Sequence, residues 1–180
     1  MASPSVVERR QPSVIALCAV SATAVAVLCF VRFGFEPRAW VAAYFAGVLA
    51  VLTAIDLERR ILPNRIVLPS TAVVLLANVA IEPSRSPEWA AAALAAAAFL
   101  SLPLLMHPAG IGMGDVKLGL LLGAGLGKSV AVGLVLGFLA VLPVAVFILL
   151  RQGSKARRAT IPFGPFLAFG ALVTLFIEGV

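Results

Sequence analysis

The stretch HPAGIGMGDVKLGLLLGAGLG, residues 107–127, places one carboxylate, Asp115, between a glycine-rich turn and an apolar run of Leu and Gly. The run over residues 115–126 has the composition of a membrane helix, yet it covers only about 18 Å at 1.5 Å per residue. A hydrocarbon core is about 30 Å thick. Irregular backbone at that depth is tolerated where it lines a cavity. We therefore expect this helix to begin in a water-filled recess with Asp115 at its floor.

The composition of the whole chain supports a membrane protein. Of the 180 residues, 62% are hydrophobic and 12% are charged, against roughly 25% charged in an ordinary soluble domain. Apolar runs of about 17 to 25 residues indicate spanning helices. We predict an all-α, polytopic membrane helix bundle of about seven transmembrane helices. The expected helices cover residues 13–31, 39–55, 66–81, 89–106, 115–126, 130–150 and 163–177.

The basic residues predict an orientation. With a cytoplasmic N-terminus, ten of the 14 Lys and Arg fall on the cytoplasmic side, as the positive-inside rule requires. These ten are Arg9, Arg10, Arg59, Arg60, Arg65, Lys117, Arg151, Lys155, Arg157 and Arg158, and the other four are Arg32, Arg38, Arg85 and Lys128. Because they lie in short clusters between apolar runs, without interleaved aromatic residues, they argue against nucleic acid as the partner of this +6 chain.

We expect a single membrane-embedded domain over residues 1–180, with an extra N-terminal helix in residues 1–37 and a core in residues 38–180. The first apolar run is too long for a signal peptide, so we expect it to be retained. Cys18 and Cys29 both fall inside that run and form no CxxC pair. With His107 as the single histidine, we expect neither a metal site nor a cofactor.

Two aspartates stand out among the eight acidic residues. Asp56 closes the second apolar run and Asp115 opens the fifth, so both lie at the same membrane face. Two facing carboxylates repel when both are ionised, so such a pair holds one proton near neutral pH, which suits aspartic peptidase chemistry. The structural alternatives are a helix-end charge beside Arg59 and Arg60 for Asp56 and a helix N-cap for Asp115.

The glycines before Asp115 suggest a place for substrate. Gly110, Gly112 and Gly114 permit positive φ and close backbone approach, so an extended segment could lie beside Asp115. Tight helix packing is the alternative explanation. The stretch does not fit a phosphate-binding loop, because it lacks GxxxxGK[ST] and an acid follows the glycines.

Three sequence blocks resemble the prepilin peptidase family, the GxGD-type type IV leader peptidases. They are DLERRILPN at residues 56–64, GMGDVK at residues 112–117 and IPFGPFLAFG at residues 161–170. The resemblance implies catalytic roles for Asp56 and Asp115. It also implies a pilin-like precursor as substrate, with a short basic leader that is cut in the cytoplasm just before a hydrophobic helix. Pilus assembly or secretion machinery would be further partners in the cytoplasmic membrane.

Other residues of these blocks are candidates for binding substrate or supporting the site. They are Gly112, Gly114, Lys117, Arg60, Pro63, Asn64, Phe163, Gly164 and Pro165. Each has a structural alternative. Pro63 and Pro165 suit helix starts, Arg60 suits a positive-inside anchor, and Lys117 could hold Asp115 or reach the headgroups. We expect no catalytic role for His107, since two aspartates suffice.

Longer family members carry paired CxxC motifs and an N-methyltransferase activity. This chain lacks CxxC, so we expect peptidase activity alone. A presenilin-like intramembrane protease shares GxGD, but no PAL motif follows Asp115. A small ion-coupled transporter would use membrane acids as proton relays, yet the chain shows no internal repeat. A non-enzymatic scaffold is the remaining alternative.

Overall fold

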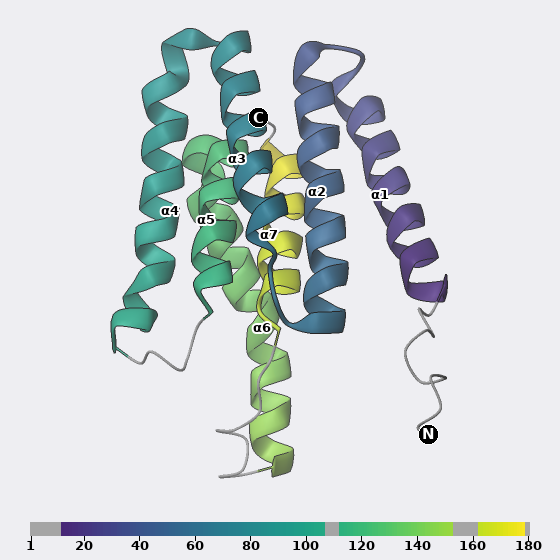
Figure 1. Ribbon diagram of the computed structural model, residues 1–180, viewed down its shortest axis with the longest axis vertical. Helices are drawn as coiled ribbons and strands as arrows, with labels where there is room; N and C mark the ends of the chain where they lie inside the picture. Colours follow the sequence, from purple (N-terminus) through teal and green to yellow (C-terminus); the bar gives the residue numbers. More distant parts are fainter. Residues whose placement is uncertain (1–11, 107–111, 153–161, 179–180) are drawn as a thin grey trace, which may run out of the picture.

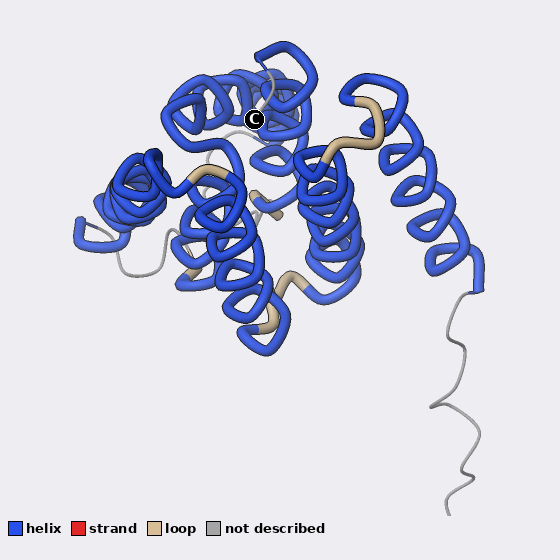
Figure 2. Tube along the Cα trace, turned by 90° about the horizontal axis from the view of Figure 1, so that it is seen from above, coloured by secondary structure: helices blue, strands red, loops and turns tan. Residues whose placement is uncertain are grey.

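The computed structural model describes residues 12–106, 112–152 and 162–178. These residues form helices joined by short loops, which confirms the all-α expectation (Figures 1 and 2). His107 and Gly110 lie outside the described residues. The elements are α1 (Pro12–Phe33), α2 (Pro37–Arg59), α3 (Asn64–Ile81), the short η1 (Pro83–Arg85), α4 (Ser86–Met106), α5 (Met113–Leu126), the short η2 (Gly127–Ser129), α6 (Val130–Gln152) and α7 (Gly164–Glu178).

Within the described residues, three helical stretches are long and apolar enough to cross a membrane: Pro37–Arg59, Asn64–Ile81 and Met113–Arg151. The third runs through α5, η2 and α6. It is interrupted at Gly127, whose φ of 56° ends α5. After this turn α6 runs back toward the lower end of the bundle in Figure 1. The count of seven spans and the cytoplasmic N-terminus stay predictions.

Small residues let the helices approach closely. A Cβ at Gly123 of α5 would collide with the backbone of Ala92 and Ala93 of α4. A Cβ at Gly170 of α7 would likewise collide with the backbone of Gly133 of α6. Close backbone approach is how membrane helices gain packing energy without a hydrophobic driving force. The part of α4 around Ala92 and Ala93 therefore serves as a packing face for α5.

The core lies where α2, α5 and α7 face one another. Phe45 and Leu49 of α2, Leu121 and Leu122 of α5 and Leu175 of α7 are fully or almost fully buried. The first helix, α1, packs mainly on α2 at the edge of the bundle (Figure 2). This arrangement puts the end of α2 beside the starts of α5 and α7.

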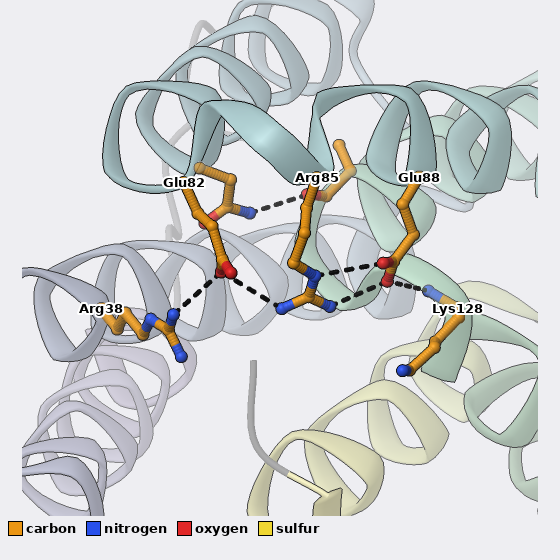
Figure 3. A network of polar contacts seen from close by, with 7 residues as sticks. Arg38, Glu82, Arg85, Glu88 and Lys128 are labelled. Atoms are coloured by element: carbon orange, nitrogen blue, oxygen red, sulfur yellow. Dashed lines mark hydrogen bonds and ion pairs between the residues drawn. The ribbon is translucent and has the colours of Figure 1, made fainter.

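A polar network closes the opposite end of the bundle (Figure 3). Arg38 at the start of α2 pairs with Glu82 at 2.9 Å, and Arg85 pairs with Glu88 at 2.8 Å. The backbone N–H of Lys128 in η2 donates to Glu88 at 3.3 Å. The Arg85 hydrogen bond lowers the pKa of Glu88 to about 2, against the opposing effect of burial. The network thus joins α2, η1, α4 and η2 far from the two aspartates.

Candidate active site

Three helix ends meet at the lower end of the bundle in Figure 1. They are the last turn of α2 with Asp56, the first turn of α5 with Asp115, and the first residue of α7, Gly164. The sequence ended the second span at residue 55, but α2 continues to Arg59. Because of these extra residues, Asp56 lies inside a helical turn and is held by its backbone.

The Asp56 side chain is buried, with 5% of its surface exposed. Its Oδ2 atom accepts a hydrogen bond from the backbone N–H of Gly164 at 3.1 Å. A buried carboxylate is costly unless it is hydrogen-bonded. The Gly164 N–H therefore supplies a fixed partner for Asp56 from a segment 108 residues away in the chain.

Asp115 lies half-buried in the first turn of α5, and its carboxylate interacts electrostatically with Asp56. The backbone N–H of Asp115 donates to the carbonyl of Gly112 at 3.0 Å. The N-cap of α5 is Gly112, because the helix begins at Met113, two residues earlier than the sequence indicated. The N-cap alternative for Asp115 is therefore wrong, and the residue presents its side chain from within the helix.

The glycines beside Asp115 do not use their freedom for positive φ. Gly112 has φ of −73°, which any residue adopts, and among the described residues an added Cβ would come within 4 Å only of the Gly114 nitrogen, at 3.9 Å. Gly114 lies against the loop between α2 and α3, where an added Cβ would approach the Leu62 Cβ to 3.0 Å. Gly114 is therefore a packing contact with that loop, while Gly112 has no such close contact within the described part of the chain.

The loop after Asp56 is tied to the α5 turn that carries Asp115. Lys117 Nζ donates to Asn64 Oδ1 at 2.8 Å. Asn64 begins α3 and Pro63 occupies its N-cap position, as the sequence indicates. We expected Lys117 to contact Asp115 or the lipid headgroups, but in the structure it joins two of the three sequence blocks.

Arg60 ends α2 in the left-handed region, with φ of 53°. Its backbone N–H donates to the carbonyl of Asp56 at 2.8 Å. Glycine is the usual residue at such helix ends, so an arginine there carries backbone strain. The sequence offers no sign of this strain, since nothing in ERRIL resembles a glycine stop.

Phe163 and Pro165 flank Gly164 at the start of α7. Pro165 is the second residue of the helix, where a missing N–H costs nothing. The Phe163 ring packs against the Phe138 ring of α6, with centroids 5.1 Å apart. Phe138 and Leu62 are the contacts of this site that sequence reasoning missed, because both belong to ordinary apolar runs.

The site presents two interacting carboxylates, one of which is hydrogen-bonded to a backbone N–H at a helix start. In the described part of the chain, no three His, Cys, Asp or Glu side chains group together as a metal site requires. Two carboxylates of this kind can take up and deliver one proton between them.

Comparison with known proteins extends these observations. The chain matches the type IV leader peptidase family over residues 43–150. It is similar to the prepilin leader peptidase/N-methyltransferase of Bacillus subtilis, with 30% identity over 79% of this chain and 58% of the relative. The proteins of the same name from Burkholderia pseudomallei (32% identity, 89% and 53%) and Legionella pneumophila (31%, 81% and 52%) are also similar.

The matching part runs from within α2 to near the end of α6 and includes Asp56, Asp115 and the Lys117–Asn64 contact. The chain spans little more than half the length of the curated relatives it matches. No solved structure matches it. From the family match and the extent of similarity to these relatives, we conclude that the chain belongs to the type IV leader peptidase family.

Proposed function

We propose that the chain is a membrane aspartic endopeptidase that cleaves the short basic leader from type IV pilin-like precursors. The observation that carries this proposal is the interaction of Asp56 and Asp115 at the meeting point of three helix ends. Membership of the type IV leader peptidase family supports the substrate class. The relatives are named as both leader peptidases and N-methyltransferases. Only the peptidase part is proposed here, since Cys18 and Cys29 form no CxxC pair.

In the proposed mechanism the two carboxylates hold one proton as a unit. The ionised member removes a proton from water, and the water oxygen attacks the carbonyl carbon of the scissile peptide. The protonated member donates its proton to the carbonyl oxygen. Collapse of the tetrahedral intermediate breaks the C–N bond. The protonated member gives its proton to the leaving amine, and the ionised member takes the proton of the hydroxyl that becomes the new carbonyl, which restores a pair with one proton.

The supporting residues then have defined tasks. The Gly164 N–H orients Asp56, and the Lys117–Asn64 hydrogen bond holds the Asp115 turn against the loop after Asp56. The extended peptide would lie beside Gly112, where none of the described residues crowds the backbone. Positioning of this kind accounts for a large share of enzymatic rate enhancement.

We further propose that the site faces the cytoplasm. Basic residues cluster at the end of the bundle that holds the two aspartates, as the positive-inside rule requires of the cytoplasmic side. In the described residues these are Arg59, Arg60, Arg65, Lys117 and Arg151. A site at that surface reaches the junction between a cytoplasmic leader and a membrane helix, which is where a pilus or secretion precursor would be cut.

The test is co-expression with a precursor that has a short basic leader and a hydrophobic helix. We expect wild type to shorten the precursor, and D56N and D115N to leave it intact. The matched control is E58Q, because Glu58 is an exposed acid two residues after Asp56 on the same helix. Normal processing by D56N or D115N would overturn the two-aspartate mechanism, and an intact precursor with wild type would overturn the peptidase function.

A further inference from the structure

An apolar groove of about 310 Å³ lies between α4 and α6. Its lining combines three alanines with larger apolar side chains from both helices. Phe99 and Val135 are about half exposed, which shows that the groove opens to the surface of the bundle. The residues that matter here are Ala95, Ala96, Phe99, Ala131, Val135 and Phe138.

The groove is connected to the candidate active site by a row of aromatic rings. Phe99 and Phe138, both in the groove, have centroids 5.9 Å apart in an edge-to-face contact. Phe138 in turn contacts Phe163 at 5.1 Å. The next residue, Gly164, donates its N–H to Asp56. One end of the groove therefore adjoins the segment that holds a carboxylate of the pair.

We propose that this groove binds the hydrophobic helix of the precursor, directly after the bond that is cut. The inference rests on the proposed peptidase function and adds the surface that would receive the substrate. A helix satisfies its own backbone hydrogen bonds, so it can lie in a groove without polar partners. The alanines let its backbone approach α4 and α6 closely.

The length of the groove sets how much of the occupant it could hold. From Val130 to Phe138, α6 rises about 12 Å, so about eight residues of a bound helix would lie along it. The side chains of those residues that face α4 and α6 would enter the groove, while the peptide before them continues past Phe163 to the carboxylates. A lipid acyl chain is the alternative occupant of the groove. Lipid binding would not depend on the sequence that precedes the hydrophobic helix of the precursor.

Cysteine cross-linking tests the contact directly. The starting variant has Cys18 and Cys29 replaced by Ser, and it carries D115N so that the precursor is not cleaved. V135C then introduces one cysteine into the groove. V132C is the matched control, because Val132 is exposed on the same helix outside the groove. With a precursor that has one cysteine within the first eight residues after the cleaved bond, we expect a higher disulfide yield with V135C, which lies in the groove lining, than with V132C, which lies one turn away on the neighbouring part of the helix. Equal yields at both positions, or none at V135C, would overturn the proposal.

A filled groove provides the second readout. A131L places bulk in the groove, whereas A98L adds the same bulk to an exposed position of α4 outside it. We expect A131L to lower kcat/KM for the full precursor about tenfold, as for one lost apolar anchor. Cleavage of a leader peptide without the hydrophobic helix should be unchanged. If A131L cleaves the full precursor with the same kcat/KM as wild type, the groove does not bind the hydrophobic helix. If wild type cleaves nothing, the peptidase function fails, while the V135C cross-link still decides the groove.

Discussion

Replacing Gly164 by Ala tests how closely the start of α7 controls Asp56. An added Cβ would lie 2.7 Å from Asp56 Oδ2 and 3.3 Å from its Cγ. Carbon contacts become favourable only at about 3.5 Å, so the carboxylate must move by about half an ångström or more. The 3.1 Å hydrogen bond from Gly164 would then lengthen beyond bonding range.

The loss of that bond sets the expected magnitude. A hydrogen bond to a charged group contributes about 2 kcal/mol, which corresponds to roughly a thirtyfold loss of kcat/KM if the bond orients the reacting carboxylate. The assay is cleavage of a leader-bearing precursor by purified G164A in detergent, with thermal unfolding as the check on folding. The control is G47A, because a Cβ at Gly47 of α2 meets no described residue within 4 Å. If G164A has the thermal stability of wild type and also its kcat/KM, Gly164 does not control the position of Asp56.

Three further predictions follow from contacts near and far from the site. A double-mutant cycle of K117M and N64A, measured as precursor cleavage, should give a coupling of about 1 kcal/mol through their 2.8 Å bond, and strictly additive effects would contradict it. The unfolding free energy of R60G should be about 1–2 kcal/mol larger than that of R60V. The φ of 53° at Arg60 is left-handed, and glycine adopts this conformation without the steric cost that valine has. Equal stabilities would contradict this. The pKa of Glu88 falls from 4.5 to about 2 on folding, so its contribution to stability is present above pH 4.5 and is lost as pH falls toward 2. Wild type should therefore lose more thermal stability than E88Q between pH 6 and pH 3, and parallel losses would show that the Arg85 pairing is not responsible.

The all-α class could be predicted from the sequence, and so could the position of the DLERRILPN and GMGDVK blocks at one end of the bundle. Both follow from the mean hydropathy of long stretches of residues. Apolar runs mark helices, and the order of the runs places the end of α2 and the start of α5 at one end of the bundle. Asp56 and Asp115 become candidates for this reason, since an acid at the edge of an apolar run is rare enough to be noticed.

The contacts that organise the site could not be predicted, because they use groups without a sequence pattern. The donor to Asp56 is the backbone N–H of Gly164, which every non-proline residue possesses. The strain at Arg60 arises where a glycine would be expected. Lys117 has a long side chain that can reach several partners, and its choice of Asn64 depends on how α3 and α5 are packed.

The boundaries of helices differ for a local reason. Helix α5 begins at Met113 because Gly112 can serve as its N-cap in an ordinary extended conformation. Hydrophobicity alone starts the helix later, at Asp115, because the two preceding residues do not continue the apolar run clearly. The shift turns Asp115 from a cap into a side chain of the first turn.

The most direct test of the account is the rate of precursor cleavage by purified D56N, D115N and the double variant D56N/D115N. Residues that act as one catalytic unit have strongly non-additive effects. If the two aspartates act as one unit, each single variant loses about a thousandfold or more in kcat/KM, and the double variant is no slower than the singles. A single variant that cleaves at the wild-type rate, or a double variant whose loss equals the product of two partial losses, would contradict it.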